Sequence, residues 1–129
     1  MRFIHTADWH LGRYFHGMHL TADQREIIMG QLVPLVQEEK VDAVVIAGDI
    51  YDRGVPPVEA VDLFDEFLMK MAEMHIKVFY IAGNHDSESR LNFGSQLMRA
   101  SGIFARGRLD DEMAPVVVED DFGPVAVYL

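Results

Sequence analysis

The sequence predicts an α/β fold built on a parallel sheet. Three short apolar runs, at 2–6, 42–47 and 76–82, are too short for helices and are typical of buried strands. Between them lie two longer segments, about 22–38 and 57–73, whose apolar residues recur at helical spacing. This alternation is the pattern of a βαβαβ unit with right-handed crossovers.

Length and composition place the chain among single globular domains. It has 129 residues, half of them hydrophobic and a quarter charged, and no cysteine. The lack of cysteine excludes disulfides and thiolate metal sites and fits a reducing compartment, so we expect a cytoplasmic protein. His5, Asp8 and His10 interrupt the apolar residues after Arg2, and we expect neither a signal peptide nor a membrane span. The net charge of −10 argues against a general nucleic-acid-binding module, although carboxylates that hold cations are neutralised by them.

The first helical segment carries two features that predict its course. Thr21 and Gln24 resemble a capping box that opens the helix. Pro34 removes a backbone donor, which predicts a kink or a break. Residues 11–20, just before the helix, have no regular period and contain two glycines, so we expect a loop there.

The second helical segment carries two adjacent apolar stripes. It begins after Pro56 and at Pro57, since proline is tolerated in the first turn of a helix. One stripe would suffice to cover a sheet, so the second predicts burial on another side, such as against a partner. The stripes are Val61, Phe64, Leu68 and Met71, and Ala60, Leu63 and Phe67.

The last third of the chain predicts a helix and then short strands. Ser87 or Ser89 is expected to cap the helix, which ends near 101–102. After it we expect a strand at 103–105, a polar turn at 107–112, and a hairpin of strands 116–119 and 125–129. Because domains rarely end in mid-strand, we expect residues 1–129 to be the N-terminal part of a longer protein.

Polar side chains follow each of the three predicted central strands. Asp8 and His10 follow the first, Asp49 the second and Asn84 the third, so all four should meet at the carboxyl edge of the sheet. A carboxylate with an imidazole suits a divalent transition metal such as Mn, Fe or Zn. Asp49 could bridge two metals, with Asn84 on the second, and such a pair can clamp a phosphodiester for in-line displacement.

The residues after Asn84 predict acid–base chemistry. His85 could donate to phosphoryl oxygens or protonate a leaving alkoxide, and Asp86 could orient it. Taken alone, the Asp-x-His pair occurs often by chance, and the other two motifs could be simple turns. Their shared position after apolar strands favours a metal site over coincidence.

Three stretches of this chain resemble the motifs of the calcineurin-like metallophosphoesterases. They are His-Thr-Ala-Asp-Trp-His-Leu-Gly at 5–12, Gly-Asp-Ile-Tyr-Asp at 48–52 and Ala-Gly-Asn-His-Asp-Ser at 82–87. The resemblance covers about residues 2–104. The forms Asp-Trp-His-Leu-Gly and Asn-His-Asp, with two prolines after the second motif, are similar to the bacterial DNA-repair nucleases of that family. Asp52-Arg53-Gly54 also resembles serine/threonine protein phosphatases.

The resemblance implies a fold, a reaction and partners. The fold would be the first half of a two-layer sandwich plus a short hairpin. Asp8 and His10 would bind the first metal, Asp49 would bridge, Asn84 would bind the second, and His85 would be catalytic. The reaction would be Mn²⁺-dependent cleavage of DNA, as a 3′–5′ exonuclease at duplex ends and an endonuclease at hairpins, with an ATPase partner of the coiled-coil type.

Contact residues for DNA and for a homodimer are also expected. Arg13, Arg53 and Arg90 follow the three motifs and could meet phosphates. The family dimerises through the helices after the second and third motifs, which here contain Leu63, Phe67 and Leu97.

One departure from the family is expected to affect activity. The family supplies three further histidine ligands later in the chain, whereas no histidine follows His85 here. We therefore expect these 129 residues alone to be inactive or nearly so. Two alternatives stay open: a protein or nucleotide phosphatase of the same family, and a non-catalytic piece that folds, binds a partner or dimerises.

Overall fold

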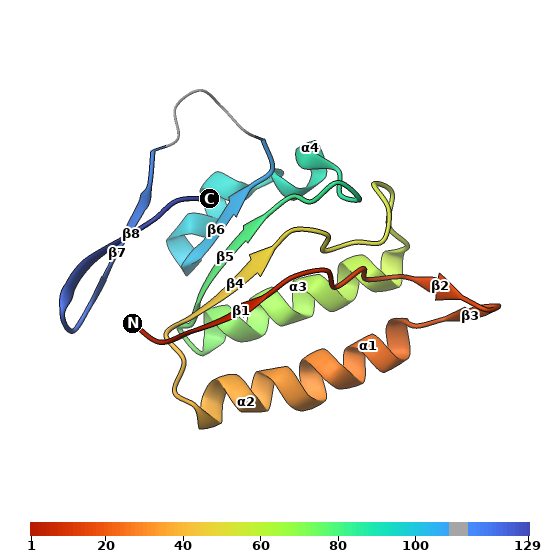
Figure 1. The fold of residues 1–129 in the computed structure, drawn as a ribbon, viewed down its shortest axis with the longest axis horizontal. Coiled ribbons are helices and arrows are strands. Elements are labelled where there is room, and N and C mark those ends of the chain that lie inside the picture. The colour runs from red at the N-terminus through yellow and green to blue at the C-terminus, as the bar shows by residue number, and fades with distance from the viewer. Residues whose placement is uncertain (109–113) are drawn as a thin grey trace.

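A four-stranded parallel sheet forms the centre of the molecule (Figure 1). The computed structural model describes residues 1–108 and 114–129. The sheet order is β1 (Phe3–Thr6), β4 (Ala43–Ala47), β5 (Lys77–Ile81) and β6 (Ile103–Arg106). All three pairings are parallel, and β1 and β4 are in register from Phe3 opposite Ala43 to Thr6 opposite Ile46. The predicted α/β class is confirmed.

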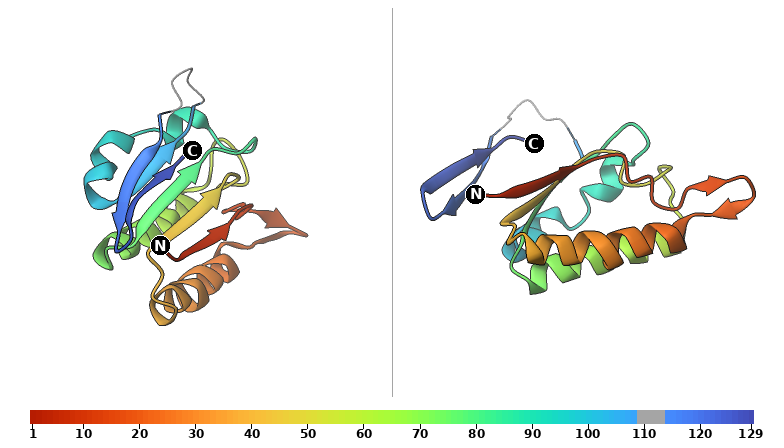
Figure 2. Two further views of the ribbon diagram at one scale, coloured as in Figure 1. Left: turned by 60° about the vertical axis from the view of Figure 1, so that its left-hand side comes forward. Right: turned by 60° about the horizontal axis from the view of Figure 1, so that its bottom comes forward.

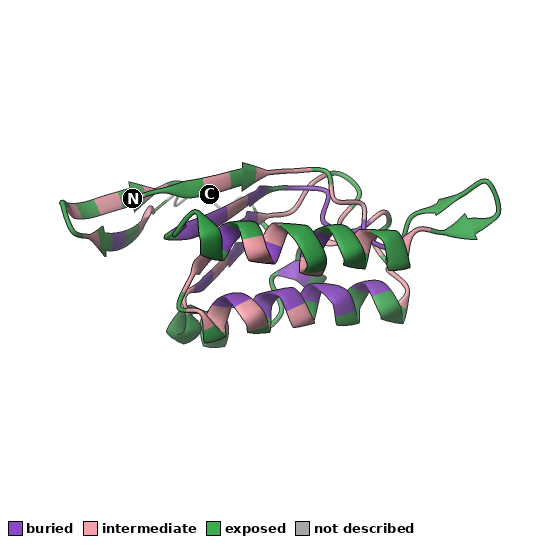
Figure 3. Cartoon of the chain, turned by 90° about the horizontal axis from the view of Figure 1, so that it is seen from below, coloured by how far each residue is buried: buried purple, intermediate pink, exposed green. Residues whose placement is uncertain are grey.

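Two long helical stretches cover one face of this sheet (Figure 3). The first is a continuous run of α1 (Thr21–Ile27), the π-helix η1 (Ile28–Leu32) and α2 (Val33–Glu38), and the second is α3 (Val58–Glu73). The interruption expected at Pro34 takes the form of the π-helix, in which the Val33 N–H reaches back five residues to Ile28 O. This wider turn precedes Pro34, which then lies in the first turn of α2.

Helix α3 buries residues of both predicted apolar stripes. Ala60, Leu63, Phe64, Phe67, Leu68 and Met71 are all buried. They belong to one core that also includes Ile28 and Val36 of the neighbouring helical stretch, and Val44 and Tyr80 of the sheet. The expectation that Leu63 and Phe67 form a dimer surface is therefore wrong, since both are fully buried within this chain. The second stripe is buried within this chain, where Trp9 packs against Phe67 and Gly12 lies against Ala60.

Two local expectations at the start of the first helix are also wrong. Residues 11–20 contain a small hairpin, β2 (Tyr14–Phe15) and β3 (Met18–His19), which the two glycines and the lack of a period had obscured. The helix has no side-chain cap, and its N-cap residue is Leu20. The Gln24 side chain instead bonds to the backbone of Trp9 and His10.

The region after β5 is broken into short turns of helix. Ser87 precedes α4 (Glu88–Leu91), and then come α5 (Ser95–Met98) and the 3₁₀ helix η2 (Arg99–Ser101). Gly94, with a φ of 72°, separates the first two, and Gly102, with a φ of 79°, ends the third. The single helix expected here is thus interrupted at Gly94, while its predicted end is confirmed.

A second hairpin packs against the sheet face that the helices leave open. β7 (Val116–Asp120) and β8 (Gly123–Val127) pair antiparallel, as predicted, and Val118 contacts Ala43 and Phe79 in a small separate core. The Met1 ammonium group forms an ion pair with Asp120 of this hairpin. The two hairpins lie at opposite ends of the molecule (Figure 2). The polar turn expected at 107–112 falls mostly on residues 109–113, which lie outside the described residues.

Within residues 1–108 and 114–129, every helix is too short or too polar to cross a bilayer.

Candidate metal centre

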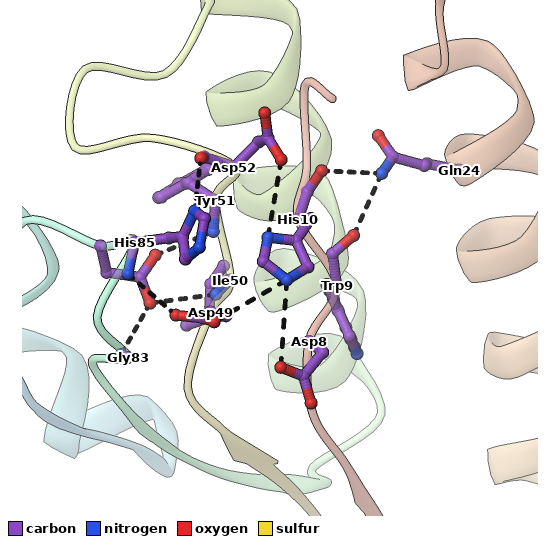
Figure 4. A network of polar contacts seen from close by, with 11 residues as sticks. Asp8, Trp9, His10, Gln24, Asp49, Ile50, Tyr51, Asp52, Gly83 and His85 are labelled. Carbon is purple, nitrogen blue, oxygen red and sulfur yellow. Dashed lines mark hydrogen bonds and ion pairs between the residues drawn. The ribbon is translucent and has the colours of Figure 1, made fainter. Parts of the chain in front are cut away.

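The loops that leave β1, β4 and β5 meet at the carboxyl edge of the sheet, where parallel α/β sheets form their ligand sites (Figure 4). Asp8 and His10 lie after β1, Asp49 after β4, and Asn84 and His85 after β5. Asp8, His10 and Asp49 all have a positive φ, of 57°, 45° and 49°. Such a backbone is rare for residues with a side chain, and it clusters at functional sites.

Backbone hydrogen bonds join the first loop to the second. The Asp8 N–H donates to Gly48 O at 3.1 Å, and the His10 N–H donates to Asp49 O at 2.9 Å. The Leu11 N–H continues the series to Ile50 O at 2.8 Å. The two loops therefore run side by side beyond the end of the sheet, and the side chains of His10 and Asp49 face each other.

The His10 ring lies among three carboxylates. Its Nε2 is 3.9 Å from Asp8 Oδ1 and 3.7 Å from Asp49 Oδ2, and its Nδ1 is 3.6 Å from Asp52 Oδ1. Nδ1 is buried and has no hydrogen-bond partner among the described residues. Ligand atoms of Asp8, His10 and Asp49 lie within 4.8 Å of one another, as do those of His10, Asp52 and His85.

This donor set fits a divalent cation. Carboxylates that converge on one point repel each other unless a positive charge lies between them. Side chains of His10 and Asp49 are only 15% and 12% exposed, whereas that of Asp8 is 70% exposed, so the group opens to solvent on the Asp8 side. Carboxylate oxygens with an imidazole nitrogen favour Mn, Fe or Zn.

His85 lies beside this group. Its ring is 4.8 Å from the His10 ring between centroids, and its backbone N–H donates to Asp49 Oδ1 at 3.0 Å. Its Nδ1 is 2.9 Å from Asp52 O. Because a carbonyl oxygen only accepts, Nδ1 carries the proton, and Nε2 is left for other partners. Asn84, the preceding residue, is exposed in the same loop.

Asp86 has a different task from the expected one. Its carboxylate accepts three backbone hydrogen bonds, from Ile50 at 3.0 Å, Tyr51 at 2.8 Å and Gly83 at 2.9 Å. The partner of the His85 ring is instead the carbonyl of Asp52. The expectation that Asp86 orients His85 is therefore corrected: Asp86 joins the second loop to the third.

Close backbone packing completes this junction. A Cβ on Gly83 would lie 2.1 Å from Asp49 Oδ1 and 2.3 Å from Asp49 N. Only glycine allows the third loop to approach the Asp49 carboxylate this closely. Tyr51 lies below the junction, and burial raises the pKa of its hydroxyl.

The first loop has a further support that the sequence pattern did not reveal. Gln24 of α1 forms hydrogen bonds with the backbone of Trp9, His10 and Gly12. Its spacing from Thr21 matched a capping box, and that local pattern concealed the longer-range role. The Trp9 ring packs edge-on against Phe64 and Phe67, below the site.

The remaining expected contact residues differ in exposure. Arg13, Arg53 and Arg90 are exposed. Leu97 is 82% exposed and lines a groove of about 670 Å³ with Phe93, which is 85% exposed. Of the three expected dimer residues, only Leu97 is therefore accessible.

Comparisons with known proteins identify the family of this chain. The family model described as calcineurin-like phosphoesterase matches residues 1–123. The chain is 40% identical over 119 residues to a Staphylococcus saprophyticus subsp. saprophyticus protein named as the D subunit of the nuclease SbcCD, covering 92% of this chain and 31% of that protein. A Staphylococcus epidermidis protein of the same name is 38% identical over 117 residues, covering 90% and 31%. The chain thus spans about a third of the length of these relatives.

Proposed function

Because the chain belongs to the calcineurin-like phosphoesterase family, we propose that its strand-end cluster is the first part of a two-metal phosphodiesterase site. The observation that carries this proposal is the position of His10, whose Nε2 faces the carboxylates of Asp8 and Asp49. Asp8 and His10 would hold one ion, Asp49 would bridge, and Asn84 would hold the second. We propose Mn²⁺ for both, since imidazole and carboxylate ligands suit it.

The residues would divide the work of phosphodiester cleavage. Divalent cations lower the pKa of water and polarise phosphoryl oxygens, which is the chemistry they would supply here. His85 would present Nε2 to the phosphoryl oxygen or to the leaving alkoxide, because its Nδ1 is held by Asp52 O. Asp86 would act indirectly, by holding the backbone on which Asp49 and His85 depend.

We further propose that the longer protein is a DNA nuclease of the SbcD type. The names of both relatives support this, since each is called the D subunit of a nuclease. The proposed reactions are 3′–5′ exonuclease cleavage at duplex ends and endonuclease cleavage at hairpins, in DNA repair with an SbcC-type ATPase. The exposed Arg13, Arg53 and Arg90 would contact phosphates near the loops they follow.

We propose that a homodimer of the longer protein would use the groove beside Leu97. The groove is lined by apolar side chains of α3 and of the α4–α5 region, including Val61, Phe64, Leu91 and Phe93. Two large side chains there, Phe93 and Leu97, are more than four-fifths exposed. A patch of this kind favours protein association.

The 129-residue chain alone is proposed to have little or no activity. No histidine follows His85, so the ligand set described above lacks the additional imidazoles that the family resemblance implies. This observation favours one second candidate, a non-catalytic piece that folds and associates. A comparison of the longer protein's activity on duplex DNA and on a small phosphoester separates the proposed nuclease from a phosphatase of the same family.

The test is Mn²⁺ binding to this chain by calorimetry. Asp49→Ala should abolish binding, while Asp62→Ala, which removes an exposed carboxylate of α3, should leave it unchanged. Equal binding by wild type and Asp49→Ala would contradict the proposed site. Robust Mn²⁺-dependent nuclease activity from the isolated chain would contradict its proposed inactivity.

A further inference from the structure

Gln24 connects helix α1 to the loop that carries Asp8 and His10. Its Nε2 donates to Trp9 O at 3.0 Å and to His10 O at 2.9 Å, and its Oε1 accepts from the Gly12 N–H at 3.1 Å. The two carbonyls only accept and the Gly12 amide only donates. One orientation of the Gln24 carboxamide therefore satisfies all three groups.

The loop that Gln24 holds has an unfavourable backbone. Asp8 and His10 both adopt a positive φ, which residues with a side chain rarely do, so the surrounding structure must hold this conformation. On one side the loop is bonded to the second motif through the His10 and Leu11 amides. The carbonyls of Trp9 and His10 face α1 instead, where Gln24 is the side chain that donates to them (Figure 4).

Gly12 shows that the loop is also confined from another direction. A Cβ on Gly12 would lie 2.6 Å from Pro57 Cγ and 3.0 Å from Ala60 Cβ, so the backbone lies directly against the start of α3. Its amide is at the same time bonded to Gln24. The end of the loop is thus held between two helices, and its conformation depends on both.

We infer that Gln24 is a positioning residue of the metal centre. By bonding the Trp9 and His10 carbonyls it fixes the rotation of the loop backbone, and this rotation directs His10 Nε2 toward Asp8 and Asp49. The inference rests on the proposed function for its metal-binding consequence. Its structural part, the orientation of the His10 ring, can be measured without a metal.

Two variants of Gln24 and one matched control test the inference. Gln24→Leu keeps most of the side-chain volume and removes all three hydrogen bonds. Gln24→Glu keeps the acceptor for Gly12 but places a carboxylate against two carbonyl oxygens, so it tests the donors alone. Gln37→Leu changes the same residue type on α2, where the side chain is exposed and forms no hydrogen bond with the described residues.

The first measurement uses the metal-free chain and nuclear magnetic resonance. The His10 and His85 rings, 4.8 Å apart, should give a cross-relaxation peak in wild type and in Gln37→Leu. The peak should be lost in Gln24→Leu and weakened or lost in Gln24→Glu. The amide signals of β4 and β5 should remain those of the folded protein. If Gln24→Leu does not fold, Gln24→Glu carries the test.

The second measurement is Mn²⁺ affinity of the same proteins by calorimetry. Loss of a group that orients a metal ligand typically lowers affinity about 10–100-fold, and we expect a decrease of this size for both Gln24 variants. Retention of the ring contact and of affinity within about twofold in both variants would overturn the inference. Loss of the ring contact in a chain whose wild type binds no Mn²⁺ would refute the proposed metal function and still support the positioning role.

Discussion

The Asp86 carboxylate is expected to be the strongest single polar contribution to the folding of the site. It accepts the N–H groups of Ile50, Tyr51 and Gly83 at 2.8–3.0 Å, and so connects the loops after β4 and β5. A hydrogen bond to a charged group contributes about 1.5–3 kcal/mol, and such contributions add incompletely. For Asp86→Ala we expect a loss of about 3–5 kcal/mol in the free energy of unfolding.

The variant Asp86→Asn keeps the size of the side chain but removes its charge and one acceptor oxygen. Its comparison with Asp86→Ala therefore separates these losses from the loss of the whole side chain. Oδ2 of Asp86 accepts from Ile50 and Gly83, while Oδ1 accepts from Tyr51. The amide of Asp86→Asn can keep its oxygen toward the two donors and must then turn its NH₂ toward the Tyr51 N–H. The bond from Tyr51 is therefore lost, and two N–H donors face each other in its place. We expect this to lower the free energy of unfolding by about 2 kcal/mol.

Urea unfolding followed by far-UV circular dichroism measures both values. Asp62→Asn is the control, because Asp62 is exposed on α3 and such surface changes stay within about 0.5 kcal/mol. A loss of stability in Asp86→Ala no larger than in this control would show that the carboxylate does not stabilise the junction. Equal stability of the asparagine and alanine variants would show that the retained acceptor contributes nothing.

Other contacts lead to three further predictions. Gly83→Ala should lower the free energy of unfolding in urea by about 3 kcal/mol, because its Cβ would lie 2.1 Å from Asp49 Oδ1. In the control Gly54→Ala the nearest atom to the new Cβ would be 3.8 Å away, so the loss should be about 0.5 kcal/mol or less. Equal losses in the two variants would contradict this prediction. Burial raises the pKa of Tyr80 to about 12, above its unfolded value of 10.0, so its contribution to stability is present below pH 10 and is lost as pH rises toward 12. Wild type should therefore lose about 2–3 kcal/mol more than Tyr80→Phe over this range, and parallel pH profiles would exclude the effect. The Met1–Asp120 ion pair raises the pKa of the ammonium group above 8.0 and lowers the pKa of Asp120 below 3.8. Its contribution to stability is therefore lost as pH rises through the pKa of the ammonium group, and also as pH falls through the pKa of Asp120. The difference in Tm between wild type and Asp120→Asn should thus be largest between these two values, and a difference independent of pH would contradict the ion pair.

Local patterns in the sequence determined the sheet and the place of the candidate site. The β-branched runs at 42–47 and 76–82 could be read as strands because a parallel strand covered on both faces is apolar along its whole length. Asp8, His10, Asp49 and His85 could be placed together because adjacent parallel strands end at the same edge of a sheet. The β7–β8 hairpin was also predicted, since its turn residues interrupt two apolar runs.

Contacts between distant segments were decided only by the tertiary structure. Gln24 meets backbone groups 12–15 positions away, and Asp86 meets Ile50 and Tyr51. Leu63 and Phe67 are buried in the chain's own core rather than against a partner chain. A side chain with several possible partners follows its local pattern only when no better partner comes within reach in the folded chain. Periodicity and spacing describe which groups need burial or hydrogen bonds, whereas the packing of the elements determines which other groups provide them.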